Sequence, residues 1–404
     1  MTAALADIKV LDLSRVLAGP WCTQTLADLG AEVIKVESLS GDDTRHWGPP
    51  FLGEGDKKLS AYFSCVNRNK KSLAVDLKKP EGIALIHQLV RQADVVVENF
   101  KTGGAEKLGI GYDTLKEMNP GLVYCAISGY GRTGPRKDLP GYDFIIQAEA
   151  GMMSITGPEQ GEPFKVGVAI ADMITGQNAV NAILAALIAR GKTGEGQFID
   201  ISLYESQAQW LANVASNTLF SGKDAKRYGN AHANIAPYQA FRATDGWLVL
   251  AVGNDRQWQR LCDVLNRADW KDDPRFATNP QRVEHRDVLC PQLADVFATK
   301  SVDDWIDLID DVGVPVGKVH SIKEVLESPL MEERGMNVRL HHPLLNTDIP
   351  VVGSALNLSE TPVTYADAPP LTGQHTREVL QNSLNLKPAD IDGLVAQGIV
   401  GTTE

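Results

Sequence analysis

Short apolar runs alternate with amphipathic stretches along the first half of the chain. The runs predict strands and the stretches predict helices, and this alternation is typical of right-handed crossovers and a mostly parallel sheet. We therefore expect a large, doubly wound, Rossmann-like α/β domain. The predicted strands are 8–13, 32–37, 94–99, 122–127 and 198–203, and the predicted helices are 21–29 and 81–93.

The second half of the chain has a different pattern. A helical pattern covers 204–220, and from about Tyr228 a strand at 247–252 precedes helices rich in Trp and Asp. This part predicts a second, smaller α+β domain. Strand-like residues return at 349–352, and a helix is predicted at 376–384.

Composition excludes several classes of protein. The chain has 404 residues, of which 43% are hydrophobic and 22% charged, and no apolar run reaches the ~18 residues of a membrane span. The net charge of -12 argues against nucleic acid as a partner. The five cysteines are widely spaced and form no C-x-x-C pair, which indicates reduced thiols. Since a strand pattern begins by Ile8, we expect no leader peptide and a cytoplasmic protein.

Polar and glycine-rich loops follow the predicted strands. In a doubly wound sheet, ligands bind beyond the carboxyl ends of the strands, so these loops are the expected site. A dinucleotide site would need G-x-G-x-x-G in the first loop, but only Gly19 is present, followed by Pro20 and Trp21. NAD binding is therefore disfavoured. The loops are 15–20, 41–47, 99–101 and 129–131.

Asp172 is a lone carboxylate in an apolar, glycine-flanked run, 166–176. A desolvated carboxylate can attack an activated acyl group and carry it as a mixed anhydride. The alternative is an N-cap, because Asp often accepts backbone N–H bonds at the start of a helix such as the one predicted from Ile174 to Ala189. The residue alone does not decide between these roles.

A basic cluster, Asn67-Arg68-Asn69-Lys70-Lys71, stands out in this acidic chain. It is a candidate for binding a polyanionic small molecule. Short charge runs also often face solvent, so a solvated turn remains the alternative.

Taken together and in order, the motifs resemble the family III CoA-transferases of the CaiB/BaiF type. This group includes formyl-CoA transferase, a carnitine CoA-transferase and α-methylacyl-CoA racemase, and the resemblance covers essentially the whole chain. The motifs are Arg15-Val16-Leu17-Ala18-Gly19-Pro20, Gly30-Ala31-Glu32-Val33-Ile34-Lys35-Val36-Glu37, Asn67-Arg68-Asn69-Lys70-Lys71-Ser72, Val97-Glu98-Asn99-Phe100, Gly129-Tyr130-Gly131, the Asp172 segment and Lys192-Thr193-Gly194-Glu195-Gly196-Gln197.

The resemblance implies a nucleophilic role for Asp172. In the family, the matching Asp attacks the donor thioester to give an acyl anhydride, CoA thiolate converts this to an aspartyl thioester, and the acceptor carboxylate attacks in turn. Coenzyme A and acyl-CoA are then substrates, and no cofactor is bound permanently. The residues expected to bind CoA are Val16, Ala18, Lys71, Lys78, Asn99, Phe100, Lys101, Lys107 and Tyr142. For each lysine the alternative is a solvated side chain.

The racemase branch carries a His at the position that matches Tyr142. A Tyr, with an ordinary pKa of about 10, is a poor reversible base near neutral pH, whereas His is a good one. Tyr142 therefore favours the transferase. A racemase and a non-catalytic acyl-CoA-binding protein remain alternatives, although the retained Asp172 argues against the second.

The segments 41–51 and 228–241 look most like the succinyl-CoA:glutarate CoA-transferase branch, and Leu17 replaces the Gln of formyl-CoA transferase. A dicarboxylic acceptor has a second carboxylate to be paired, for which Arg offers a bidentate fork. Arg45 is the candidate, with Trp47 as an apolar wall and His232 as a further contact. The alternative for Arg45 is a surface ion pair with Asp42 or Asp43.

The resemblance also implies an interlocked homodimer and an inserted domain. The large CoA-binding domain is then expected at 1–220 and 321–404, and the small α+β domain at 221–320. The expected partners are acyl-CoA, small carboxylic acids and a second copy of the chain, with neither nucleic acid nor membrane.

Overall fold

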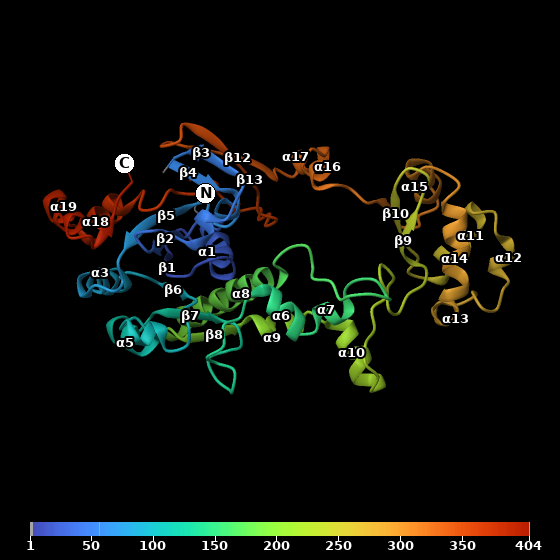
Figure 1. Cartoon of the computed structure of the whole chain (residues 1–404), viewed down its shortest axis with the longest axis horizontal. Coiled ribbons are helices and arrows are strands. Elements are labelled where there is room, and N and C mark those ends of the chain that lie inside the picture. The colour runs from blue at the N-terminus through green and yellow to red at the C-terminus, as the bar shows by residue number, and fades with distance from the viewer. Residues whose placement is uncertain (1–2, 56, 404) are drawn as a thin grey trace. The chain divides into compact units, whose positions relative to one another are not determined.

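The computed structural model describes residues 3–55 and 57–403 and divides into two compact units (Figure 1). The sheet unit comprises the chain up to Ala150, Val166–Trp210 and the part from Pro329 on. The small unit comprises Gly151–Lys165 and Leu211–Ser328. The segments 151–165 and 211–220 thus belong to the small unit.

A seven-stranded sheet organises the sheet unit. Its order is β14-β5-β2-β1-β6-β7-β8, and each neighbouring pair is parallel except β14 and β5 (Figure 1). The strands are β1 (Lys9–Asp12), β2 (Glu32–Glu37), β5 (Lys70–Val75), β6 (Val95–Glu98), β7 (Val123–Ser128), β8 (Phe198–Ser202) and β14 (Val400–Gly401). The expected mostly parallel α/β sheet is confirmed.

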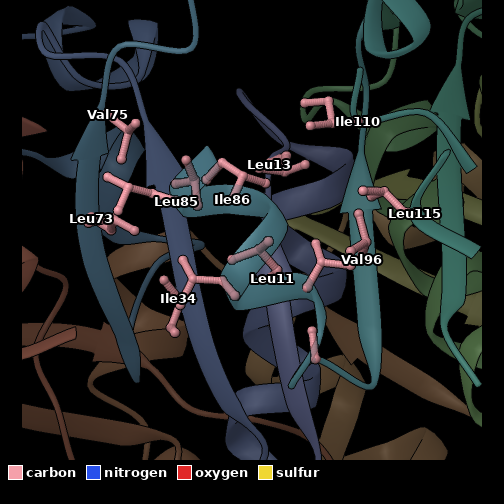
Figure 2. Close-up of a cluster of buried hydrophobic side chains, with 14 of the residues drawn as sticks. Leu11, Leu13, Ile34, Leu73, Val75, Leu85, Ile86, Val96, Ile110 and Leu115 are labelled. Atoms are coloured by element: carbon pink, nitrogen blue, oxygen red, sulfur yellow. The ribbon is translucent and has the colours of Figure 1, made fainter. Parts of the chain in front are cut away.

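The apolar runs form strands because both faces of the sheet are covered. Successive side chains point to opposite faces, so Leu11 and Ile34 join one core cluster while Val10 and Val33 join another. Figure 2 shows the first cluster, in which Leu85 and Ile86 lie with Leu11, Ile34 and Val96. Full burial stabilises each such side chain by about 1.5–3 kcal/mol.

Helices and two hairpins make up most of the rest of the sheet unit. The helices are α1 (Ala18–Asp28), α2 (Ala61–Ser64), α3 (Pro80–Val90), α4 (Gly104–Lys107), α5 (Tyr112–Met118), α6 (Asp143–Glu149), α8 (Ile170–Thr193), α9 (Leu203–Gln209), α17 (Pro329–Glu333), α18 (Thr376–Leu384) and α19 (Pro388–Ala396), with the 3-10 helix η1 (Asp43–His46). The hairpins are β3 (Phe51–Glu54) with β4 (Lys57–Ser60), and β12 (Asn337–His342) with β13 (Thr347–Val352).

The small unit contains a three-stranded antiparallel sheet in the order β11-β10-β9. Aromatic side chains such as Trp258, Trp270 and Phe297 fill its core. Its elements are α7 (Met152–Ile155), α10 (Ala212–Ser221), β9 (Tyr238–Arg242), β10 (Trp247–Ala251), α11 (Asp255–Val264), α12 (Ala268–Lys271), α13 (Asn279–Glu284), α14 (Arg286–Phe297), α15 (Val302–Asp310), β11 (Val316–Lys318) and α16 (Ile322–Leu326).

The single helix predicted over 204–220 is two helices. α9 ends at Gln209 and α10 begins at Ala212, which has a positive φ of 43°. An L-residue with positive φ is incompatible with a continuous right-handed helix, so the chain turns there.

Among the described residues, we find no helix with the length and apolar character needed to cross a membrane. All five cysteines lie in the described part of the chain and are free thiols.

Candidate active site

The site lies where the connections of the sheet reverse direction. From β1 the chain continues to β2 and β5 on one side, and β6, β7 and β8 lie on the other. The loops after β1 and β6 therefore face each other at the switch point, the usual ligand position in such sheets. Asn99 joins these loops, because its Oδ1 accepts from Arg15 N (2.9 Å) and its Nδ2 donates to Arg15 O (2.8 Å).

A cavity of about 220 Å³ opens between these loops. Residues from seven segments of the sheet unit line it, including the carboxyl end of β7 and the start of α8. The lining residues are Arg15, Val16, Ala18, Asp43, Asn99, Phe100, Lys101, Thr102, Ile127, Ser128, Gly129, Lys137, Asp138, Leu139, Pro140, Gly141, Tyr142, Asp172 and Leu203.

Asp172 is the third residue of α8, not its N-cap. The N-cap is Ala169, with no side-chain cap bond, so the helix begins before the Ile174 that the apolar pattern indicated. The capping role considered from the sequence is therefore wrong. The carboxylate of Asp172 instead accepts a backbone hydrogen bond from Ala18, the first residue of α1.

Asp143 braces the start of α8 from α6. Its Oδ1 accepts from Ala171 N (2.8 Å), and its Oδ2 accepts from Gln147 Nε2 (2.7 Å). Gln147 Oε1 in turn accepts from Val166 N (2.8 Å). These bonds satisfy a free N–H of the first helical turn and hold Asp172 toward the cavity wall.

The environment of Asp172 raises its pKa to about 7. Burial is the largest cause, and the negative charge of Asp143 adds to it. The bond from Ala18 lowers the pKa but does not offset these two effects. A carboxyl group whose pKa is shifted this far in a cavity is a candidate nucleophile or acid.

Six of the nine residues expected to bind CoA line the cavity with Asp172. They are Val16, Ala18, Asn99, Phe100, Lys101 and Tyr142. Lys107 is exposed at the end of α4, just beyond the loop that carries Lys101. Lys78 is exposed in the loop after β5 and does not line the cavity.

The charged side chains of the basic cluster 67–71 are paired within the fold. Arg68 is buried and pairs with Asp28 (2.5 Å), and Lys70 is fully buried and pairs with Asp12 (3.1 Å). Lys71 bonds Glu32 (3.1 Å) and Glu378 (3.0 Å). The expectation that this cluster meets the phosphates, with Lys71 as a contact, is not retained, because its charges are neutralised within the fold.

Arg45 is also committed to the fold. Its side chain bonds both carboxylate oxygens of Glu37 (2.7 and 2.8 Å) and Pro370 O (2.8 Å), and it stacks on Phe63. It is 7% exposed, and its fork is occupied. We therefore do not retain Arg45 as the partner of a dicarboxylate, and its expected surface partners, Asp42 and Asp43, are replaced by Glu37.

Trp47 packs against Tyr62, and Tyr62 in turn lies within electrostatic range of Asp172. The two aromatic rings pack edge to face with centroids 5.0 Å apart. Burial, followed by the charge of Asp172, raises the pKa of Tyr62 to about 12, which places Tyr62 in electrostatic range of that carboxylate. His232 belongs to the small unit, where its Nδ1 accepts from Asn234 N (3.0 Å).

The sequence and the structure are similar to those of known proteins. Residues 5–376 match the family described as CoA-transferase family III. The chain belongs to this family. It is 46% identical to a succinate–glutarate CoA-transferase of Agrobacterium fabrum over 383 residues (93% of this chain and 94% of that one), and 43% identical to the human succinyl-CoA:glutarate CoA-transferase over 401 residues (99% and 90%). A crystal structure of a CAIB/BAIF family protein from Brucella suis matches with a TM-score of 0.85 and 42% identity, covering 95% of this chain and 100% of that one.

The transferase reading of the sequence is thus confirmed for the enzyme class, and the racemase and the non-catalytic protein are not supported. CoA thioesters are the substrates of such transferases.

Several residues at the site of this family III CoA-transferase were not predicted from the sequence. Asp143 stands directly after Tyr142, which the sequence indicated as the position of the racemase His and as a CoA contact, but no role was predicted for Asp143 itself. Lys137 lines the cavity opposite the loop after β6, and its carbonyl accepts from Thr102 Oγ1 (2.6 Å). The charged run Arg136-Lys137-Asp138 was a signal, but no strand pattern nearby placed it at the site.

The raised pKa of Asp172 predicts a pH dependence for the transferase. Since only the ionised carboxylate can attack, we expect kcat/KM for the donor to fall about tenfold per pH unit below pH about 7. Asp143→Asn removes a negative charge but keeps an acceptor for Ala171 N. The substitution lowers the pKa of Asp172. The acid limb, which is the part of the kcat/KM profile that falls with decreasing pH, therefore moves to lower pH by about one pH unit. Initial rates from pH 5 to 9 measure the shift.

Glu149→Gln is the matched control for this change. Glu149 stands at the other end of α6 and pairs with Arg136 (2.6 Å). We expect its acid limb to coincide with that of the wild type. An Asp143→Asn limb that stays in place would mean that Asp143 does not tune Asp172.

Proposed function

We propose that this transferase moves CoA from succinyl-CoA to a dicarboxylic acid such as glutarate, with Asp172 as the nucleophile. The observation that carries this proposal is the position of Asp172, whose desolvated carboxylate lines the same cavity as Asn99, Phe100 and Lys101. The names of the relatives support the choice of acids.

The first step is attack on the donor. An Asp172 oxygen bonds to the thioester carbonyl carbon of succinyl-CoA, the C–S bond breaks, and CoA leaves as the thiolate. The product is a mixed anhydride between succinate and Asp172. The carbonyl group stays activated through this exchange, so no ATP is required.

The remaining steps exchange the acids. The CoA thiolate attacks the Asp172 carbonyl of the anhydride, which releases succinate and leaves an aspartyl-CoA thioester. The acceptor carboxylate attacks that thioester and expels the thiolate, forming a second anhydride. The thiolate then attacks the acceptor's carbonyl, which yields the new acyl-CoA and restores the Asp172 carboxylate.

The cavity offers the groups that CoA requires. Arg15, Lys101 and Lys137 supply positive charge for phosphates, and Phe100 and Leu139 supply apolar surface for the adenine and pantetheine. We propose Tyr142, which is 67% exposed at the start of α6, as a further contact with the thioester arm. Trp47 and Tyr62 do not line the cavity, and Tyr62 acts only as an aromatic neighbour within electrostatic range of Asp172.

A panel of acids with succinyl-CoA as donor tests the substrate proposal. We expect glutarate to give the highest kcat/KM, and propionate and butyrate to be at least about tenfold poorer, since a second carboxylate contributes a charge-assisted bond. The new acyl-CoA is measured by liquid chromatography. Equal kcat/KM for butyrate and glutarate would contradict a dicarboxylate site.

We propose that the functional form is a homodimer. α10 has no buried residue, and its Leu219 and Phe220 are 83% and 94% exposed. Clustered exposed apolar side chains of this kind mark interaction surfaces. Sedimentation equilibrium is expected to give twice the mass of one chain, whereas the mass of one chain would contradict the dimer.

A further inference from the structure

The loop after β1 contains a strained residue. Val16 has a φ of 69°, in the left-handed region that β-branched residues rarely adopt, and it lines the cavity. Such a conformation persists only where surrounding contacts hold it, and it tends to occur at functional sites. The contacts that hold Val16 therefore indicate what the loop is built to do.

Asp42 provides the hold on Val16. Its carboxylate accepts from Val16 N at 3.2 and 3.4 Å, and also from Thr44 N (3.0 Å) and Thr44 Oγ1 (2.8 Å). Asp42 is 1% exposed. A buried carboxylate that accepts this many bonds has a fixed orientation, so it fixes the Val16 amide in turn.

Lys35 ties this carboxylate to the end of β1. Its fully buried Nζ donates to Asp42 Oδ2 (2.9 Å) and to Ser14 O (3.0 Å). One ammonium group thus holds the loop at Ser14 directly and at Val16 through Asp42. Lys35 stabilises the Asp42 carboxylate, whose pKa is lowered to about 2 although burial alone would raise it.

The loop leads directly to the nucleophile. Arg15 is clamped by Asn99, Leu17 is the N-cap of α1, and the next residue is Ala18, whose backbone bonds Asp172. The direction of the Ala18 N–H follows from the dihedral angles of the two residues before it. A change at Val16 would therefore turn this N–H away from Asp172.

We propose that Asp42 is a positioning residue for catalysis, which holds Val16 in its left-handed conformation so that Ala18 N–H reaches the Asp172 carboxylate. This inference rests on the proposed nucleophilic role of Asp172. It adds that the buried Lys35–Asp42 pair acts on the reaction through a backbone N–H, although neither side chain lines the cavity.

The pH profile separates this role from a purely structural one. Besides burial, the groups that shift the pKa of Asp172 are Asp143 from α6 and the Ala18 N–H from α1. Tyr62 from α2 lies in electrostatic range but is neutral near pH 7. Loss of the N–H bond leaves burial and Asp143 unopposed, so the pKa of Asp172 rises further. A loss of stability alone would leave this pKa in place.

The test compares Asp42→Asn with the wild type. Asn keeps the shape and one acceptor but removes the charge that Lys35 orients. We expect the acid limb of kcat/KM to move to higher pH by about one pH unit. KM for succinyl-CoA is expected to rise about tenfold, because Val16 and Ala18 line the cavity. Asp28→Asn is the matched control, since Asp28 is also a buried carboxylate in an ion pair, with Arg68 (2.5 Å), but does not line the cavity, and its acid limb is expected to stay in place.

A second substitution tests the strained residue itself. Gly adopts positive φ without steric cost, so a loop with Gly at position 16 does not need Asp42 to hold it. The acid limb of the double variant Val16→Gly/Asp42→Asn is therefore expected to lie close to that of Val16→Gly alone. Where Asp42→Asn does not fold, Thr44→Val removes one bond that orients Asp42 and is expected to shift the limb in the same direction. Folded variants with the wild-type limb and KM would overturn the proposal.

The nucleophile is checked separately in the wild type. A covalent adduct on Asp172 together with an unshifted Asp42→Asn limb defeats only the positioning role. A wild type that turns over without any adduct on Asp172 defeats the proposed function as well.

Discussion

Asp172→Asn is expected to reduce CoA transfer by at least about a thousandfold, because an amide cannot form the anhydride. The variant keeps the volume and much of the polarity of the side chain, so the dissociation constant of CoA is expected to stay within about threefold of the wild type. Steady-state rates and calorimetric titration with CoA measure the two effects. Near-normal turnover would remove Asp172 from the mechanism.

The matched control for this loss is Asp113→Asn. Asp113 is an exposed carboxylate in the first turn of α5, so it shares with Asp172 a place near a helix N-terminus. We expect it to keep wild-type rates. Loss of activity in both variants would point to a general effect of removing a helix-terminal charge.

The same substitution has a signature in stability. The pKa of Asp172 is raised in the folded chain, so its ionised form costs folding free energy above pH about 7, and this cost disappears as the pH falls toward that of an unfolded Asp, about 4. Asp172→Asn is therefore expected to be more stable than the wild type at pH 8, by on the order of 1–3 kcal/mol. The difference narrows at pH 5. Denaturant melts at the two pH values measure it.

Gly176→Ala is expected to lower kcat/KM by about a hundredfold without unfolding the protein. Gly176 lies one turn after Asp172 on α8, and a methyl group there would stand 2.6 Å from Ala18 O and 2.9 Å from Trp21 Cδ1. Either α8 or α1 must move, at a cost of about 1–3 kcal/mol. The movement separates Ala18 from Asp172, the contact on which the site depends. Gly176 is thus a residue that permits close packing of α1 against α8.

Gly191→Ala in the same helix is the control. A methyl group at Gly191 meets no described atom within 4 Å. Ala is the better helix former, so this variant is expected to keep its activity and gain up to about 1 kcal/mol of stability. A Gly176→Ala enzyme as active as Gly191→Ala would show that the α1–α8 contact does not position Asp172.

The sheet was predictable because its strands are buried on both faces. Such strands are largely apolar runs that stand out in the sequence, and β2 has the predicted bounds. The helix α18 also begins and ends where it was predicted. β5 was harder to predict, because Lys70 looks like a surface residue in the sequence. Its burial depends on Asp12, which is distant in sequence, and only the fold brings the two together. The pairing of Arg45 with Glu37 was not predicted for the same reason, because only the fold brings these two side chains together.

The site was predictable where motifs follow strands. Val16, Ala18, Asn99, Phe100 and Lys101 come together because parallel strands end at one edge. Lys71 does not join them, because it lies at the amino end of β5, where it pairs with Glu32. Asp143 was missed because its role is to bond the backbone of α8, and sequence patterns do not show such a contact.

Mass spectrometry of the wild-type enzyme tests directly whether Asp172 is the nucleophile. The enzyme is incubated with succinyl-CoA, quenched in acid and digested, and the peptide that contains Asp172 is examined. We expect this peptide to gain the mass of CoA less one water, as a thioester on Asp172, and glutarate to discharge it. Full turnover with an unmodified Asp172 peptide, or an adduct on another residue, would show that Asp172 is not the nucleophile.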